Sequence, residues 1–338
     1  MSIGAERVSG IAVWSSDGWR RPVLAWLDER LAAAGIERTG PVEQPHVQPW
    51  ATVLTAPTTT GPVWLKACCP GTASEVGLYE FLVRAAPDSV LRPIASDTTR
   101  GWLLLPDGGA PLGERCSGVE LADAVAGVLR RYGRLQRDLA PYAGELVALG
   151  VADMRPAALP ARFVTAVEVV SGVLGRRGTD EDREALRRVT GLQDAVAEWA
   201  TELAAAPGAA SIDHNDLHPW NMLVDGRFYD WGDAVVAHPF ASALVALRSL
   251  RAELGVEHDH PAILRARDAY LDAFADLAPR AELVRTLELA CCLAKVARTL
   301  TWHRAVEHED PETVGELALA PVRSLTSLLV PSYLGDVY

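Results

Sequence analysis

The sequence predicts an α+β protein with two lobes: a small N-terminal lobe in which an antiparallel sheet packs with a helix, and a larger, mostly helical C-terminal lobe. Two observations support this prediction. Strand-like patterns are confined to roughly the first third of the chain, and helical periodicity dominates after Pro111. The length of 338 residues is also enough to bury more than one core. We expect the lobes to span residues 1–106 and 107–338.

The N-terminal lobe is expected to begin with a helix and to continue as a sheet. Residues 20–35 carry apolar side chains at helical spacing and end at a glycine. Residues 51–56 and 63–67 have strand-like composition and are joined by Pro-Thr-Thr-Thr-Gly-Pro, which predicts a hairpin. A short helix over 73–85, a strand over 101–105 and a Pro-Asp-Gly-Gly turn are expected to complete this lobe.

The C-terminal lobe is expected to consist of amphipathic helices. Residues 121–139 place Leu, Val and Tyr side chains on one side of a helix. Thr179 and Asp182 have the spacing of a capping box and predict a helix that runs to about Ala205. Further helices are predicted at 240–254, 261–277, 281–306 and 311–329.

The most informative segment spans residues 212–233 and contains Asp216, Asn221 and Asp230. Asp225-Gly226, near its middle, is typical of a two-residue hairpin turn. Counting outward from that turn pairs Asn221 with Asp230, and opposed residues in an antiparallel pair lie roughly 5 Å apart. Carboxylate and amide oxygens are ligands that suit Mg²⁺. The segment therefore predicts a magnesium site at the open end of a hairpin, with Asp216 on the loop that leads into it.

This segment resembles the catalytic segment of the protein-kinase-like superfamily. The protein-kinase pattern is H-R-D-L-x-x-x-N followed by D-F-G. The same spacing is met here by His214, Asp216, Leu217, Asn221 and the triplet Asp230-Trp231-Gly232. A second histidine, His218, and the Trp in place of Phe are typical of the aminoglycoside phosphotransferase and choline kinase family of small-molecule kinases. The resemblance implies a two-lobed protein-kinase-like fold.

The resemblance also implies a reaction and its cofactors. The chain would transfer the γ-phosphoryl group of ATP, with GTP as an alternative, to a hydroxyl of a small molecule: an aminoglycoside or other antibiotic, a sugar, an amino sugar or an amino alcohol. Asp216 would be the catalytic base or would orient the hydroxyl, and Asn221 and Asp230 would hold Mg²⁺.

The order of elements in the N-terminal lobe resembles the nucleotide-binding lobe of the same family. Lys66, one of only two lysines among 32 basic residues, would be the strand lysine that contacts the α- and β-phosphates. Glu75 would be its helix partner, with Glu80 as the alternative. Residues Leu104 to Asp107 would form the hinge between the lobes that faces adenine.

The chain departs from the family pattern at the turn that should cover the phosphates, within residues 44–52, because this turn contains no glycine. A non-catalytic nucleotide-binding module therefore stays as an alternative function. A protein kinase is disfavoured, because only about nine residues separate Asp230 from the next predicted helix and no Ala-Pro-Glu motif occurs.

Several polar residues outside this set have two interpretations. His214 is expected to anchor the loop, and His218 to contact either the loop or a phosphate. Asp233 is expected to orient the metal loop or to bond backbone amides. The cluster at 257–260 is expected to be a solvated loop instead of a metal site. Trp302 is expected in the core, with stacking on the substrate as the alternative.

Composition limits the partners and the compartment. A net charge of −12 disfavours nucleic acid and would suit a cationic acceptor, although solubility alone is the better explanation of this charge. No apolar run is expected to reach membrane-spanning length, and residues 1–16 lack the pattern of a signal peptide, so we expect a cytoplasmic protein. The five cysteines show no disulfide or zinc-binding spacing and are expected to be free thiols.

Overall fold

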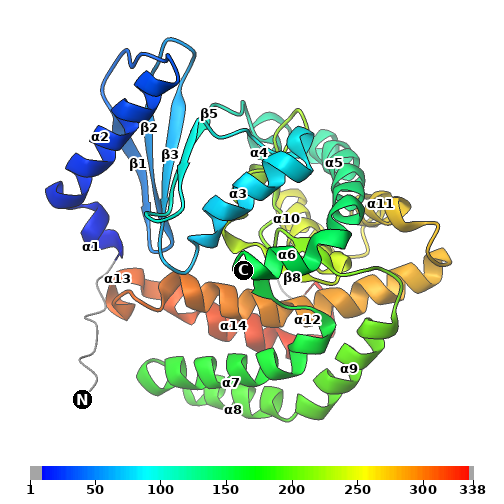
Figure 1. Cartoon of the computed structure of the whole chain (residues 1–338). Helices are drawn as coiled ribbons and strands as arrows, with labels where there is room; N and C mark the ends of the chain where they lie inside the picture. Colours follow the sequence, from blue (N-terminus) through cyan, green and yellow to red (C-terminus); the bar gives the residue numbers. More distant parts are fainter. Residues whose placement is uncertain (1–9, 335–338) are drawn as a thin grey trace.

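The computed structural model describes residues 10–334 and has the predicted two lobes (Figure 1). Residues 1–9, part of the stretch predicted to lack a signal peptide, lie outside the described residues. The N-terminal lobe contains a five-stranded antiparallel sheet of order β1-β2-β3-β5-β4. Its strands are β1 (Glu43–Gln48), β2 (Ala51–Ala56), β3 (Val63–Cys68), β4 (Ala95–Asp97) and β5 (Trp102–Pro106).

Two helices cover the opposite faces of this sheet. The first, α2 (Asp17–Ala33), packs Val23 and Leu27 against Leu65 and Leu104. The second, α3 (Ser74–Ala85), packs on the other face, where the neighbouring Leu103 and Leu105 point. Side chains alternate along a strand, so Leu104 lies in the core under α2 while Leu105 points toward the other lobe.

The C-terminal lobe is helical, and two of its helices organise it. Helix α5 lies against α11, whereas α12 contacts α7, α9, α10 and α14. Figure 1 shows α12, in orange, crossing this lobe and ending beneath the sheet. The helices are α1 (Gly10–Trp14, in the N-terminal lobe), α4 (Leu112–Arg115), α5 (Gly118–Leu139), α6 (Ala143–Ala148), α7 (Leu159–Arg176), α8 (Asp180–Thr190), α9 (Gln193–Ala205), α10 (Ala243–Leu254), α11 (Pro261–Leu271), α12 (Arg280–Val306), α13 (Pro311–Val314) and α14 (Ala320–Thr326).

Two predicted helices are interrupted in the structure. The capping box at Thr179 is present in both directions, but the helix that it opens ends at Thr190, and α9 begins after Gly191. The predicted helix over 311–329 is split at Gly315, whose φ of +56° a regular helix does not allow. Short 3₁₀ segments and α14 follow it. Glycine weakens helices, and at both positions the chain turns there instead of continuing.

One helix corrects the expectation about apolar runs. Residues Pro156–Arg176, which include α7, have a mean hydropathy of 1.5 and are long and apolar enough to cross a membrane. A single such helix is weak evidence for a span, because core helices of other proteins meet the same criterion. In this fold α7 places Phe163, Val170 and Leu174 in the core of the C-terminal lobe.

A small second sheet brings the site segments together. It consists of β6 (Ala152–Asp153), β8 (Val235–Ala237) and β7 (Ser211–Asp213), with β7 antiparallel to β8. Asp213 pairs with Val235, so the loop that leaves β7 and the loop that enters β8 meet at one end of the pair.

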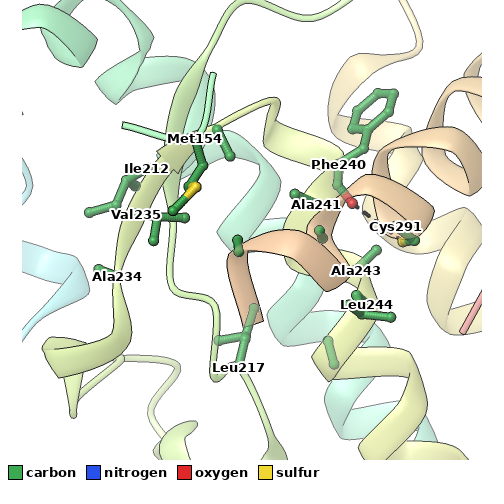
Figure 2. Packing of buried hydrophobic residues seen from close by; sticks show 14 of the residues in the cluster. Met154, Ile212, Leu217, Ala234, Val235, Phe240, Ala241, Ala243, Leu244 and Cys291 are labelled. Atoms are coloured by element: carbon green, nitrogen blue, oxygen red, sulfur yellow. Dashed lines mark hydrogen bonds between the residues drawn. The ribbon is translucent and has the colours of Figure 1, made fainter. Parts of the chain in front are cut away.

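Buried side chains pack against the small sheet. Figure 2 shows Met154 beside Ile212 and Val235, and nearby the Cys291 thiol donates to the Phe240 carbonyl oxygen at 3.6 Å. This packing fixes the sheet, and with it the starting points of both site loops.

Candidate active site

The loop after β7 carries Asp216 through a tight turn. Asn215 has φ +59°, a left-handed conformation that few residues other than glycine adopt. The Asp213 carboxylate accepts the Asn215 N–H at 2.8 Å, and the Asn215 amide donates to the Thr301 hydroxyl and to the Asp233 carbonyl oxygen. These bonds hold a strained residue next to Asp216, as is common at functional sites.

The turn in the middle of the segment corrects the predicted register. Leu223 donates to the Arg227 carbonyl oxygen at 2.9 Å, and Met222 pairs with Phe228, so the loop contains three residues instead of two. Gly226 supplies the left-handed position, with φ +85°, that such loops need at their third residue. Every predicted pair is therefore shifted by one residue.

The shifted register places Asn221 opposite Tyr229, whose N–H donates to the Asn221 carbonyl oxygen at 3.4 Å. Asp230 is one residue further along and has φ +61°. Asp230 therefore reaches the site through a left-handed bend in the backbone and not through the predicted pairing with Asn221.

Lys66 links the two lobes. Its ammonium lies 2.7 Å from Glu75 Oε2, on α3, and 2.5 Å from Asp230 Oδ1, in the C-terminal lobe. The other carboxylate oxygen of Glu75 accepts the Trp231 N–H at 3.0 Å. Glu80 points elsewhere and accepts the Ser96 hydroxyl at 2.6 Å. Of the two predicted partners, Glu75 is the one that contacts Lys66.

The charges in this cluster stabilise one another. Burial lowers the pKa of Lys66, but Asp230 and Glu75 outweigh that effect and raise the pKa well above its usual value. Burial raises the pKa of Asp230, yet the Lys66 charge and hydrogen bond bring it below the ordinary value for an aspartate. For Glu75 burial dominates and raises the pKa. Lys66 and Asp230 therefore carry opposite charges at neutral pH.

Asp216 is surrounded by groups that favour its ionised form. Its Oδ2 lies 3.3 Å from His218 Nε2, and its Oδ1 lies 3.5 Å from the Arg298 guanidinium. Burial raises the pKa of Asp216, but the Arg298 charge and the His218 hydrogen bond outweigh it and hold the pKa far below the usual value. The Asn221 amide donates to the Asp216 carbonyl oxygen at 2.9 Å. The carboxylate is therefore ionised and can accept a hydrogen bond from a hydroxyl group.

Arg298 is the site residue that the sequence did not reveal. It lies in the middle of α12, more than eighty residues after Asp216, and it is one of thirty arginines in the chain. Neither spacing nor motif distinguishes it from the others. Its guanidinium donates to Asp233 Oδ2 at 2.9 Å, which gives Asp233 a partner different from the backbone amides considered above.

The structure places the other candidate residues, His214, Trp302 and residues 257–260. His214 is buried, with Nε2 2.9 Å from the Tyr229 carbonyl oxygen and its ring 4.6 Å from that of Trp231, as expected of a residue that anchors the loop. Trp302, which was expected in the core, is instead half-buried and lies edge-on to Trp50 at 6.0 Å, between the two lobes. Residues 257–260 form a turn between α10 and α11, and the described residues contain no cluster of metal-binding side chains there.

A cavity of about 390 Å³ lies between the lobes, and its lining includes Lys66, Glu75 and Asp230 but neither Asp216 nor Asn221. Leu105, Pro106 and Asp107 of the predicted hinge also line it. Leu104 is not among the lining residues, because its side chain lies in the core under α2. The predicted hinge is therefore wrong for the Leu104 side chain, whereas Leu105 and Asp107, which were predicted with it, do line the cavity.

The glycine-free turn between β1 and β2 lines the cavity. The turn between β1 and β2 comprises Pro49 and Trp50, and Trp50 and His46 line the cavity beside Lys66. His46 and Lys66 are both paired with Val53, on opposite sides of β2, so the three side chains lie in one row on the cavity face of the sheet.

The residues present fit a magnesium ion that is shared with phosphate oxygens. The Asn221 amide nitrogen is used by Asp216, and within residues 10–334 no donor is bonded to the Asn221 amide oxygen. Asp230 supplies an ionised carboxylate. No group of three or more His, Cys, Asp or Glu side chains comes together as a metal site in the described chain. One carboxylate and one amide match the way proteins bind Mg²⁺ beside substrate phosphates.

A family comparison agrees with this geometry. The sequence profile described as the phosphotransferase enzyme family matches residues 69–283, which is more than half of the chain. The chain belongs to the phosphotransferase enzyme family. It is a small-molecule phosphotransferase, and the match covers Glu75, Asp216, Asn221 and Asp230 but neither Lys66 nor Arg298.

Solved structures with the same fold come from several kinases. A Plasmodium vivax ethanolamine kinase is 12% identical, with coverage of 94% of this chain and 90% of that chain and a TM-score of 0.61. A macrolide 2′-phosphotransferase from Brachybacterium faecium is 18% identical, with coverage of 87% and 97% and a TM-score of 0.54. A spectinomycin phosphotransferase, in complex with ADP and spectinomycin, is 11% identical, with coverage of 92% and 96% and a TM-score of 0.52. No protein of curated function matches the phosphotransferase sequence.

Proposed function

We propose that this phosphotransferase moves the γ-phosphoryl group of ATP, with Mg²⁺, to a hydroxyl group of a small molecule. The observation that carries the proposal is the convergence of Lys66, Glu75 and Asp230 on the inter-lobe cavity, with Asp216 near enough to Asp230 to raise its pKa. Lys66 and Glu75 come from the sheet lobe, and Asp216 and Asp230 come from the helical lobe. GTP is a possible donor on the same grounds, because the hinge residues do not distinguish the two bases.

The nucleotide is proposed to lie along the cavity. Its base would lie against Leu105 and Pro106, where the lining is apolar, and its phosphates would reach Lys66, which lines the same cavity. Glu75 is buried and bonded to both Lys66 and the Trp231 N–H, so it would hold the ammonium in place relative to Asp230. The compact ammonium of Lys66 would neutralise phosphate charge during transfer.

Asp216 is proposed to act on the acceptor hydroxyl. Its ionised carboxylate would accept the hydroxyl proton, or a hydrogen bond from it, and so orient the oxygen for attack on the γ-phosphorus. Asn221 and Asp230 would hold Mg²⁺, which supplies charge neutralisation at the phosphate oxygens when bound. Asn221 also fixes the Asp216 backbone, so the metal ligand and the base share one rigid loop.

The acceptor is proposed to be an aminoglycoside or other antibiotic, a sugar, an amino sugar or an amino alcohol. The named relatives include kinases of ethanolamine, a macrolide and spectinomycin, which span several of these classes. The net charge of −12 favours a cationic acceptor through long-range attraction. Five free cysteines suit a reducing compartment, and we include a cytoplasmic location in the proposal.

The test is a panel of hydroxylated small molecules incubated with the protein, ATP and Mg²⁺. ADP formation that requires one acceptor class and disappears on chelation of the metal supports the proposal. Nucleotide binding without acceptor-dependent ADP formation across all classes contradicts it. A thermal-shift screen of the same compounds with a non-hydrolysable nucleotide narrows the panel first, because a ligand that binds only the folded state raises the melting temperature.

A further inference from the structure

Arg298 forms a buried junction between the two loops of the site. Its side chain is only 5% exposed, although it carries a full charge. It donates to the Asn215 carbonyl oxygen at 2.5 Å and to Asp233 Oδ2 at 2.9 Å, and it lies 3.5 Å from Asp216 Oδ1. One guanidinium therefore contacts the residue before Asp216, Asp216 itself and the loop that carries Asp230.

A rigid fork of donors explains why arginine suits this position. The planar guanidinium presents its N–H groups in fixed directions, so it fixes the relative position of the acceptors that it contacts. Asp216 and Asp233 are both carboxylates, and without a cation between them they would repel each other. Their separation and orientation thus depend on a residue that neither loop supplies.

The Trp302 ring packs against the Arg298 guanidinium. It lies one helical turn beyond Arg298 on α12, and the guanidinium stands over its ring at 5.4 Å. The ring of Trp302 also contacts the ring of Trp50, in the turn between β1 and β2. The ion pairs of Arg298 are therefore shielded from water by aromatic side chains, and interactions between charges strengthen when water is excluded.

We propose that Arg298 is a positioning residue, which holds the Asp216 carboxylate in the orientation needed to receive the acceptor hydroxyl. The proposal deepens the function proposed above and rests on it. Arg298 lies outside the residues that the family profile matches, and it acts through Asp216 without any contact of its own with the reacting atoms.

The test compares Arg298→Met with the wild type at a temperature well below the melting temperature of both proteins. We expect turnover of Mg-ATP with an accepted hydroxyl compound to fall by about 10²-fold, the effect of a misplaced catalytic group. ADP binding is expected to stay within about threefold, because Lys66, Glu75 and Asp230 keep their contacts. Arg298→Lys keeps a buried cation, and it is expected to fold and to recover part of the turnover.

A double-mutant cycle separates positioning from a merely structural role. If Arg298 acts through Asp216, Asp216→Asn and the double variant Asp216→Asn, Arg298→Met should have the same residual turnover within about threefold. The matched control is Arg137→Met, which removes another arginine that bridges a carbonyl oxygen and a carboxylate, those of Ala273 and Asp276, on the surface. The control should turn over like the wild type.

Three outcomes overturn the inference. Turnover of Arg298→Met at the wild-type rate does so, as do losses that multiply in the double variant. If Arg298→Met does not fold, the Arg298→Lys variant decides: turnover at the wild-type rate in that variant also overturns the positioning role. A wild-type protein that consumes no ATP with any acceptor overturns the proposed function itself. The three outcomes above overturn only the role of Arg298, so the two failures are distinguishable.

Discussion

Replacing Glu75 by Gln tests how the buried glutamate acts on Lys66. The side chain is 1% exposed, its Oε2 lies 2.7 Å from the Lys66 ammonium and its Oε1 accepts the Trp231 N–H. Gln keeps the shape and an oxygen for Trp231, so the change removes mainly the charged hydrogen bond. Hydrogen bonds to charged groups contribute about 1.5–3 kcal/mol. At 1.36 kcal/mol per tenfold, kcat/KM should fall between about 10- and 150-fold.

The same change should leave stability almost intact. Burial raises the pKa of Glu75, which means that its charge is held at a free-energy penalty, and Gln removes this penalty. Lys66 also keeps Asp230 as a partner at 2.5 Å. We therefore expect the free energy of unfolding to change by less than about 1 kcal/mol.

Steady-state kinetics with varied ATP and denaturant unfolding measure the two quantities separately. Glu80→Gln is the matched control, because it changes a glutamate of the same helix that bonds Ser96 and points away from Lys66. A Glu75→Gln enzyme with wild-type kcat/KM, or one that loses several kcal/mol of stability while Glu80→Gln loses none, would refute the reasoning.

Three further predictions concern charge, pH and the turn. Lys66→Arg should lower kcat/KM by at least about tenfold in steady-state kinetics, because the wider guanidinium cannot occupy the space between two carboxylates at 2.5 and 2.7 Å. Burial raises the pKa of Asp213 from 3.8 to about 6, so its ionisation opposes folding as pH rises through that window. The stability advantage of the wild type over Asp213→Asn should therefore grow by about 2–3 kcal/mol between pH 7 and pH 4, and an advantage that is equal at both pH values would contradict this. Gly226→Ala should lower the free energy of unfolding more than Gly255→Ala. Both glycines have positive φ, but a Cβ atom at Gly226 would lie 2.2 Å from Arg131 Nη1, so Arg131 must move and lose its hydrogen bond to the Asp225 carbonyl oxygen. Equal melting temperatures for these two variants would contradict this prediction.

Local patterns, together with the resemblance to a known family of kinases, were enough to predict the fold and to select candidate site residues. The two-lobed fold is confirmed, and the strands on either side of the Pro-Thr-Thr-Thr-Gly-Pro turn are present. Lys66 and Glu75 were selected because the order of elements resembles the nucleotide-binding lobe of the family, and the structure brings them into contact. Such elements are predictable because short-range periodicity and turn residues determine them directly.

Contacts that depend on distant segments could not be predicted. The register of the 222–228 turn differs by one residue because Gly226 occupies the third position of a longer loop, which the Asp-Gly pair alone does not reveal. Leu104 points into the core and not toward the cavity, because the side of a strand that faces the cavity depends on how the sheet packs against the other lobe. Arg298 reaches the site only through the packing of α12, and no local pattern encodes that packing.

The central claim is that Asp216 acts on an acceptor hydroxyl, while Lys66 contacts the nucleotide phosphates and Asp230 holds Mg²⁺. It is tested most directly by one comparison. The measurement is the rate at which the wild type and Asp216→Asn form a phosphorylated acceptor, with ADP affinity determined for both proteins. We predict that Asp216→Asn forms product at least about 10²-fold more slowly and binds ADP as the wild type does. Equal rates of product formation, with the acceptor saturating for both proteins, would contradict the claim.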